Sequence, residues 1–271
     1  MKVGLIIKND ARSADMVKLF CDDIKADFFE LEKSDKIPDI IACFGGDGSF
    51  LRAVPFAIKY NVPIVAVNTG TLGFLSSFES DESDLFARLI TDNVFDTEEI
   101  SLFSATIIDK QTKQKQEFFF VNEATVQRVT DALSYNGAIS LCVYVDGKPC
   151  QKFVSDGVIV ASPIGSTAYS LSAGGAILSP DLDGMIITPL CPHTVSSRPI
   201  VVSATSFISV TTGDKAHDCV LLTDGVYRSA VKKDDIITIK KTNKKLKIVA
   251  GSKDFYEKLN EKLLKWGEGY V

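Results

Sequence analysis

The segment from Ile40 to Ser49 joins an apolar strand to a cluster of glycines. Ile40–Phe44 is apolar at every position, and Gly-Gly-Asp-Gly-Ser follows it directly. Because glycine has no side chain, backbone N–H groups at such a turn can approach a phosphate closely, and the amino end of a following helix favours negative charge. Ser49 has a hydroxyl that can cap this helix. The sequence therefore predicts a phosphate-binding loop formed by Gly45, Gly46, Gly48 and Ser49.

Asp47 is an unexpected residue in a loop of this kind. At 4 Å and an effective dielectric constant near 20, two unit negative charges repel each other by about 4 kcal/mol. An acid here therefore needs a role such as holding a metal ion or accepting a proton. The loop is not a P-loop, because no Gly-Lys-Ser/Thr follows, and Leu51 stands where a dinucleotide-binding Gly-x-Gly-x-x-Gly turn has its third glycine. An ordinary surface turn is the alternative, and the apolar strand before the loop argues against it.

Further polar groups follow other apolar runs. Asn68–Leu75 comes after Ile64–Val67 and contains two glycines and Phe74, although a plain strand-to-helix loop has a similar composition. Asn122 and Glu123 add an amide and a carboxylate suited to ribose hydroxyls, and polar surface is the alternative for this pair.

The stretch Asp156–Gly175 is the longest of these segments. An acid precedes the apolar run Val158–Ala161, and hydroxyls, small residues and one tyrosine follow it. Such side chains can line a flat heteroaromatic ring and bind its edge, although a turn-rich segment without function has a similar composition. The candidates for ligand contact are Asp156, Ser166, Thr167, Ala168, Tyr169 and Ser172.

The elements that position these segments change in kind along the chain. Over residues 1–98, strand-like and helix-like patterns alternate, which predicts a parallel sheet covered by helices. Over residues 99–251, short β-branched and aromatic runs alternate with turns, and Asp146-Gly147 and Asp224-Gly225 predict hairpins. We expect an α/β domain at 1–98 and an all-β domain at 99–251.

The last segment predicts an amphipathic helix. Phe255, Leu259, Leu263 and Trp266 recur at helical spacing within Asp254–Trp266. A β domain whose inner faces are already paired has less room for such an apolar stripe than a half-covered α/β sheet. We therefore expect residues 252–271 to return to the α/β domain and complete it.

Composition and charge exclude several classes of protein. The chain has 271 residues, 45% of them hydrophobic, and a net charge of −5, which argues against a nucleic-acid surface. No apolar run is long enough to span a bilayer, and the amino-terminal run within Met1–Lys8 is shorter than a signal-peptide core. The six cysteines are scattered without a Cys-x-x-Cys pair, and the two histidines lack ligand spacing. We expect a cytoplasmic protein with free thiols that binds neither nucleic acid nor membrane.

With these motifs in view, the sequence resembles the NAD kinase family. Gly45–Ser49 matches the family's Gly-Gly-Asp-Gly-Thr/Ser loop, Asn68–Leu75 its Asn-x-Gly-x-Leu-Gly-Phe segment, and Asn122-Glu123 its Asn-Glu pair. Asp156–Gly175 and Thr188–Pro199 match two further blocks. The first motif alone is weak, because lipid kinases and phosphofructokinases carry similar loops. Five motifs in family order are specific.

The resemblance implies a fold and a reaction. The fold is a Rossmann-like α/β domain followed by a β-sandwich that binds NAD, with the active site in the cleft between them. The reaction moves the terminal phosphoryl group of ATP to the 2′-hydroxyl of the adenosine ribose of NAD, giving NADP and ADP, with Mg²⁺ or another divalent cation as cofactor. A homodimer or homotetramer is also implied. Polyphosphate as a second donor, NADH as an acceptor, and the identity of the metal ligands stay open.

The family's functional residues fall on positions of this chain that are already candidates. Asp47 is implied as the catalytic base, and Asp224 as a contributor across a subunit interface. Contacts to the nucleotides are implied for Gly45, Gly46, Gly48, Ser49, Phe74, Asn122, Glu123, Asp156, Ser166, Thr167, Ala168, Tyr169 and Ser172.

Three positions depart from the family pattern. Ile164 stands where many members have Thr, Val226 where many have Gln, and Val154 where many have Arg. The change at Val154 removes a natural partner of the 2′-phosphate, so the response to NADP as an inhibitor stays open.

Two other functions fit parts of the sequence. A lipid kinase shares the glycine loop, but the net charge of −5 and the lack of a basic amphipathic helix speak against a membrane-facing enzyme. A catalytically idle NAD(P)-binding sensor would have no need of Asp47. A turnover assay separates a sensor from a kinase.

Overall fold

The computed structural model describes all residues except 23, 71–72, 110–111, 130–136, 195, 214–218 and 268–271, and the side chains of 263–267 are not described either. The chain divides into two compact units. Unit 1 consists of Met1–Ile100 with Lys245–Val271, and unit 2 of Ser101–Lys244. No helix within the described ranges has the length and apolarity needed to cross a membrane.

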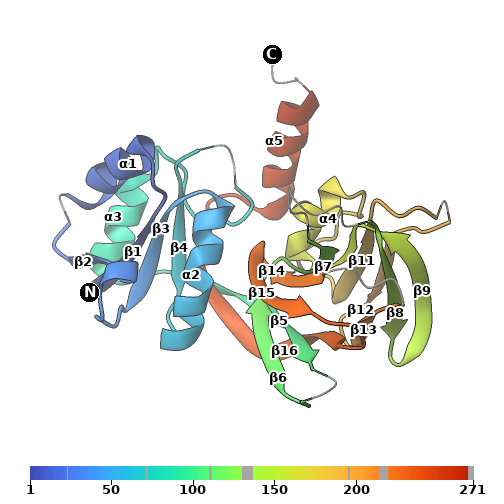
Figure 1. The fold of residues 1–271 in the computed structure, drawn as a ribbon. Helices are drawn as coiled ribbons and strands as arrows, with labels where there is room; N and C mark the ends of the chain where they lie inside the picture. Colours follow the sequence, from blue (N-terminus) through green and yellow to red (C-terminus); the bar gives the residue numbers. More distant parts are fainter. Residues whose placement is uncertain are drawn as a thin grey trace. The chain divides into compact units, whose positions relative to one another are not determined.

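Unit 1 is an α/β unit built on a parallel sheet. The strand order is β2-β1-β3-β4, and each neighbouring pair is parallel. Helices α1 and α3 lie on one face of this sheet and α2 lies on the other (Figure 1). The main elements are β1 (Lys2–Ile7), α1 (Ala11–Cys21), β2 (Asp27–Glu30), η1 (Leu31–Lys33), β3 (Ile40–Gly45), α2 (Asp47–Tyr60), β4 (Ile64–Asn68), α3 (Ser83–Asp92) and α5 (Phe255–Gly267).

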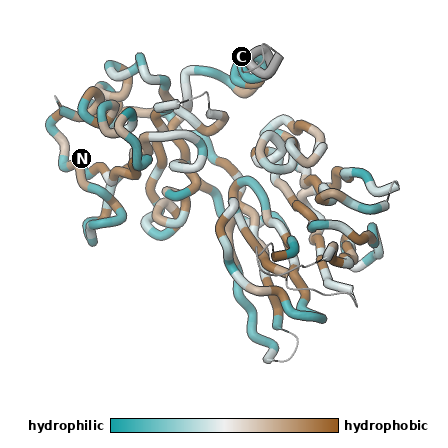
Figure 2. Tube along the Cα trace, turned by 45° about the horizontal axis from the view of Figure 1, so that its top comes forward, coloured by the Kyte–Doolittle hydropathy of each residue, from teal (hydrophilic) through white to brown (hydrophobic). Residues whose placement is uncertain are grey.

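Helices on both faces explain the apolar sequence of the inner strands. Every residue of β3 and β4 is buried, as expected for parallel strands covered on both sides. Phe20, Phe44 and Phe86 come from α1, β3 and α3 and pack edge to face, with ring centroids 5.5 to 5.9 Å apart. Figure 2 shows hydrophobic residues concentrated in the strands. This core holds the carboxyl ends of β3 and β4 side by side, with Gly45 opposite Asn68.

Unit 2 consists of two antiparallel sheets. One has the order β12-β11-β10-β7-β14-β15, and the other contains β16-β13-β8-β9. The elements are β5 (Thr97–Ile108, shared with unit 1), β6 (Lys115–Phe120), β7 (Glu123–Arg128), β8 (Ile139–Val145), β9 (Lys148–Ser155), β10 (Gly157–Ala161), η2 (Ile164–Thr167), α4 (Tyr169–Ser172), β11 (Gly184–Leu190), β12 (Ile200–Ser203), β13 (Ile208–Thr212), β14 (Cys219–Thr223), β15 (Val226–Val231) and β16 (Ile236–Val249).

The two sheets of unit 2 share one hydrophobic core. Val126 and Val158 from the first sheet and Val143 and Val210 from the second are at most 1% exposed and belong to one cluster. In β8 and β13 of the second sheet, buried residues alternate with partly buried ones, as in a sandwich strand with one face on the core. The predicted fold class, an α/β domain followed by an all-β sandwich, is confirmed.

Both predicted hairpin turns form. Asp146 and Gly147 join β8 to β9 with φ angles of 51° and 76°, and Asp224 and Gly225 join β14 to β15 with φ angles of 48° and 73°. Two successive residues with positive φ match the twist of the flanking strands. The second turn places the Asp224 side chain next to the start of β7, since β14 and β7 are neighbours.

Strand β16 contributes to both units. Residues Ile236–Ile239 pair with β13 of unit 2, whereas Ile248 pairs with Ile64 of β4 in unit 1. The sequence placed the domain boundary at residue 251. The parallel pairing with β4 brings the end of β16 into unit 1. The second segment of unit 1 therefore begins at Lys245.

Candidate active site

The glycine loop follows β3 and begins α2. A Cβ atom at Gly45 would lie 2.1 Å from the Ser49 hydroxyl oxygen, so only glycine fits there. At Gly46 and Gly48 an added Cβ would meet no atom within 4 Å. The backbone is therefore open to a ligand on the side of Gly46 and Gly48, at the positive end of the α2 dipole.

Ser49 does not cap α2 as the sequence suggested. The helix begins at Asp47, and Gly46 is its N-cap residue. Gly46 accepts the N–H groups of Ser49 and Phe50 through its carbonyl oxygen, at 2.9 and 3.4 Å. Ser49 thus lies in the first helical turn, and its side chain is buried against Gly45.

Asp47 ties the glycine loop to the segment after β4. Its carboxylate accepts the backbone N–H of Phe74 at 3.2 Å and that of Leu75 at 3.1 Å. Glycine at position 73 leaves room for this carboxylate, because a Cβ atom there would lie 2.6 Å from an Asp47 oxygen. The Asp47 side chain is 33% exposed, so a substrate can still reach it.

The segment after β4 is anchored on its other side as well. Asn68 is 3% exposed, donates to Glu79 at 2.8 Å and accepts the N–H of Gly70 at 3.0 Å. The hydroxyls of Ser13 and Thr69 are 2.7 Å apart. This network fixes the backbone that carries the two N–H donors to Asp47.

Two lysines of α5 contact the segment after β4 and the Asp47 side chain. Lys258 donates to the carbonyl oxygens of Phe74 at 3.3 Å and Ser76 at 2.7 Å. The ammonium of Lys262 lies 3.8 Å from the centroid of the Phe74 ring and 4.0 Å from an Asp47 oxygen. The Phe74 ring also lies 5.8 Å from that of Phe255. Sequence patterns placed α5 near this domain through its apolar stripe, but they did not single out its lysines.

In unit 2, the start of β7 is held by Asp224. The Asp224 carboxylate accepts the N–H groups of Val121 at 2.9 Å, Asn122 at 2.7 Å and Glu123 at 3.3 Å. Burial raises the pKa of Asp224, and these three bonds oppose that rise. Within this chain, Asp224 therefore positions the Asn-Glu pair.

Glu123 is a buried acid with an unsatisfied atom. It is 6% exposed, and its Oε2 has no hydrogen-bond partner among the described residues. Burial, together with the neighbouring Asp224, raises its pKa to about 8, while the Tyr169 backbone N–H lowers it. An unpaired buried oxygen is costly, and a ligand hydroxyl or amide could satisfy it.

The stretch after β10 separates into inward and outward residues. Ser166 is fully buried, and its hydroxyl binds both the N–H and the carbonyl of Leu178, at 3.0 and 3.2 Å. Tyr169 is 45% exposed, and Ser172 is also exposed. Thr167 and Ala168 are half-buried. Tyr169 and Ser172 thus offer more ligand surface than Ser166 does.

Asp156 has a partner that sequence reasoning missed. Arg128, at the end of β7, donates to the Asp156 carboxylate at 2.8 Å. Residue 128 lies 28 positions from Asp156 in the chain, so only the pairing of β7 with β10 brings them together. Burial raises the pKa of Tyr169, and the negative charges of Asp156 and Glu123 raise it further.

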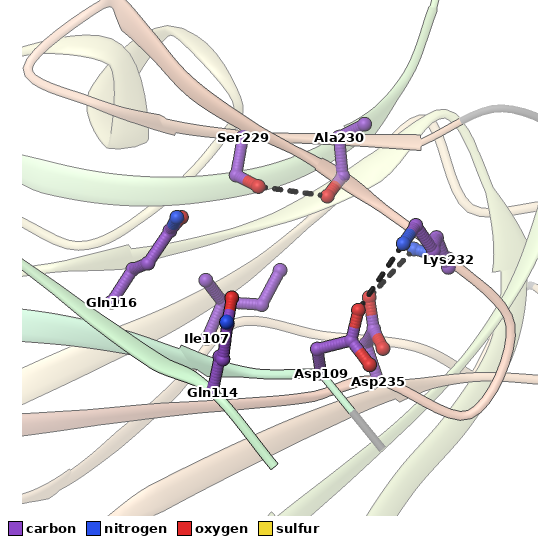
Figure 3. Close-up of a pocket in the computed structure, with 8 residues that line it drawn as sticks. All are labelled: Ile107, Asp109, Gln114, Gln116, Ser229, Ala230, Lys232 and Asp235. Carbon is purple, nitrogen blue, oxygen red and sulfur yellow. Dashed lines mark hydrogen bonds and ion pairs between the residues drawn. The ribbon is translucent and has the colours of Figure 1, made fainter. Parts of the chain in front are cut away.

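A separate cavity of unit 2 has a different lining. It measures about 230 Å³, and Lys232 pairs there with Asp109 at 3.1 Å and, through its backbone N–H, with Asp235 at 2.9 Å (Figure 3). The predicted site residues do not line it, so the cavity is no candidate for the nucleotide site. The other residues in its lining are Ile107, Gln114, Gln116, Ser229 and Ala230.

A resident metal centre is not evident in the described part of the chain. Those residues form no group of three or more His, Cys, Asp or Glu side chains suited to a metal ion. A Mg²⁺ ion that arrives with a triphosphate needs only one or two carboxylates, since phosphate oxygens and waters complete its coordination.

Both units match known protein families. Residues 8–94 match the model of the ATP-NAD kinase N-terminal domain, and residues 122–251 match that of the ATP-NAD kinase C-terminal domain. The NAD kinase of Desulforamulus reducens is 38% identical over 234 residues, which cover 85% of this chain and 79% of that protein.

Two solved structures share the fold. A crystal structure of an NAD kinase from Archaeoglobus fulgidus in complex with ATP aligns with a TM-score of 0.75 and 25% identity, covering 96% of this chain and 98% of that one. Yeast NADH kinase complexed with NADH aligns with the same TM-score and identity, covering 86% of this chain and 69% of that one.

Proposed function

The chain belongs to the NAD kinase family and is an enzyme that phosphorylates NAD, and from this premise we propose that Asp47 is its general base. Unit 1 supplies the base and the donor-phosphate loop, and unit 2 supplies the contacts to the dinucleotide. ATP is the donor, and the 2′-hydroxyl of the adenosine ribose is the acceptor.

The geometry of Asp47 is the observation that carries this proposal. The carboxylate stands at the amino end of α2, its two oxygens are oriented by the N–H groups of Phe74 and Leu75, and one third of the side chain is exposed. Hydrogen bonds that orient a carboxylate without covering it leave lone pairs for a substrate hydroxyl. A base held in this way takes the proton late, because the transition state of phosphoryl transfer is loose.

The donor phosphates are proposed to bind the backbone at Gly45–Ser49. Open space at Gly46 and Gly48 supports this proposal, because a phosphate must approach the N–H groups closely. Mg²⁺, when bound with the donor, neutralises phosphate charge. In this proposal the cation enters with ATP, and phosphate oxygens and waters supply most of its ligands.

The dinucleotide is proposed to bind the start of β7 and the exposed residues after β10. Glu123 has an unpaired buried oxygen that suits a ribose hydroxyl. The Tyr169 backbone N–H binds Glu123, and Tyr169 and Ser172 are both exposed. Asn122 is held in place by Asp224. These residues provide acceptors, a hydroxyl and one aromatic ring for adenosine.

We also propose a cytoplasmic homodimer or homotetramer. The six cysteines form no disulfide bond with one another, which suits a reducing compartment. Val201 of β12 and Val226 and Tyr227 of β15 are 50 to 59% exposed, on the two outermost strands of the six-stranded sheet. Exposed apolar side chains on outer strands favour contact with a second copy of the chain. Light scattering coupled to size-exclusion chromatography tests the oligomeric state.

A turnover assay tests the proposed function. Purified protein is incubated with NAD, Mg²⁺ and either ATP or inorganic polyphosphate, and the phosphorylated product is separated and identified. We expect NADP from ATP, with the phosphate on the adenosine ribose. A protein that binds NAD but forms no NADP with either donor would be a sensor, and the general-base role would be excluded.

A further inference from the structure

The donor-phosphate loop lacks a cation of its own. Gly45–Ser49 contains no basic residue, and its one charged side chain is the carboxylate of Asp47. A P-loop places a lysine next to its glycines, where the ammonium reaches the terminal phosphates. In this chain, a lysine or arginine from another element can supply that positive charge beside Mg²⁺ and the α2 dipole.

Lys262 of α5 holds its ammonium beside Asp47. The nitrogen lies 3.8 Å from the centroid of the Phe74 ring, and the side chain is 19% exposed. The Asp47 oxygen is 4.0 Å away, which is beyond hydrogen-bond distance. The ammonium is thus held by an aromatic face, and its N–H donors are not taken up by the neighbouring carboxylate.

Lys258, one helical turn earlier, has a different role. Lys258 is 8% exposed, and its ammonium donates to the carbonyl oxygens of Phe74 and Ser76. These two bonds tie α5 to the segment whose N–H groups orient Asp47. Lys258 therefore fixes the helix, and the fixed helix places Lys262.

We propose that Lys262 is the cation of the donor subsite and binds a phosphate oxygen of the polyphosphate chain. This inference rests on the proposed function of the glycine loop. The ligand chemistry is a chain of phosphates, carried either by ATP or by inorganic polyphosphate. An ammonium at this place offsets the repulsion between Asp47 and the phosphates, and it leaves both Asp47 oxygens to the amides and the acceptor hydroxyl.

The test compares three variants of the full-length protein. Lys262→Met keeps an unbranched apolar stem over Phe74 but removes the charge, and Lys262→Arg keeps the charge. Lys253→Met is the matched control, because Lys253 pairs with Glu261 at 2.7 Å in the same region of the chain. Calorimetry measures binding of inorganic tripolyphosphate with Mg²⁺, and steady-state kinetics measure KM for ATP and for NAD.

We expect Lys262→Met to weaken tripolyphosphate binding and raise KM for ATP by about 10- to 100-fold, the usual loss for a charged hydrogen bond. KM for NAD should stay unchanged. Lys262→Arg should recover most of the affinity, and Lys253→Met should resemble the wild type. If KM for ATP depends on Lys262 but tripolyphosphate affinity does not, the ammonium does not bind the phosphate chain, and the inference is overturned.

Equal tripolyphosphate affinity in the wild type and in Lys262→Met overturns the inference, whether or not the enzyme turns over. A wild type that forms no NADP, but binds tripolyphosphate through Lys262, contradicts the proposed function and leaves the inference standing. If Lys262→Met does not fold, Lys262→Gln is measured in its place, and unchanged binding in that variant is decisive against the inference.

Discussion

Each unit contains a loop that is held by one aspartate, and the two aspartates differ in exposure. Asp47 accepts two backbone N–H groups of unit 1, and Asp224 accepts three of unit 2. Asp47 remains 33% exposed, whereas burial raises the pKa of Asp224. The same hydrogen-bond arrangement can therefore present an acid to a substrate or bury it as a support. Exposure separates the two roles, and residue type does not.

The largest expected effect comes from Asp47→Asn. We expect turnover per folded molecule to fall by about 10²- to 10⁴-fold, the usual contribution of a positioned general base. NAD affinity should change little. The melting temperature should fall only modestly, because the amide oxygen still accepts one of the two N–H groups.

Three measurements on Asp47→Asn separate the possible roles of this acid. A purely structural acid predicts a stability loss of about 1–2 kcal/mol with normal turnover per folded molecule. An acid that anchors the metal predicts partial recovery of turnover in excess Mg²⁺. Near-normal turnover at standard Mg²⁺ would exclude the general-base role.

Asp224→Asn should show the opposite pattern. We expect the free energy of unfolding to fall by about 1–3 kcal/mol, because buried N–H groups of β7 lose their acceptor. KM for NAD should rise as the Asn-Glu pair shifts, and kcat should be retained. Chemical denaturation and steady-state kinetics check this. A loss of kcat as large as that of Asp47→Asn would mean that exposure does not distinguish the two acids.

Tyr169→Ala tests whether unit 2 presents its loop to a ligand. We expect KM for NAD to rise by up to about tenfold, since an aromatic contact contributes about 0.5–1.5 kcal/mol. The melting temperature should change little, because Tyr169 is nearly half exposed. If the variant instead unfolds readily and its folded fraction binds NAD normally, Tyr169 belongs to the core and is not a ligand contact.

The effect of Glu123→Gln should be visible in the pH dependence of stability. The pKa of Glu123 is raised from 4.5 to about 8 in the folded protein, so the folded state keeps a proton that the unfolded chain releases. Its contribution to stability is present below pH 4.5 and is lost as the pH rises towards about 8. Glu123→Gln should not lose stability in this way as the pH rises, because glutamine does not titrate. The melting temperatures of the wild type and of Glu123→Gln are measured between pH 5 and 8. If both change with pH in the same way, Glu123 is not protonated in the folded protein.

Local sequence signals predicted several elements of the fold. The strand Ile40–Phe44 and the turn at Asp224-Gly225 both depend on near neighbours, and both form as expected. Strand β11 was not predicted, because Pro189 interrupts its apolar run and proline is unusual inside a sheet. Its pairing with β10, where Val158 lies opposite Pro189, is a long-range contact that no local pattern indicates.

The candidate site divides in the same way. The glycine positions and Asp47 could be recognised because a phosphate turn needs those residue types in a short stretch. Arg128 beside Asp156, and Lys262 beside Asp47, could not be located, since their partners lie on other elements. Ser166 was expected at the ligand, but its hydroxyl is taken up by the backbone of Leu178.

By itself, the sequence determined where the phosphate loop and the hairpin turns form, because glycine and Asp-Gly adopt backbone angles that other residues resist. Only the tertiary structure decided what the two acids do. The N–H groups bound by Asp47 lie 27 and 28 positions away, and those bound by Asp224 lie 101 to 103 positions away. Whether such a carboxylate stays exposed depends on the elements packed around it, and that packing is a property of the whole fold.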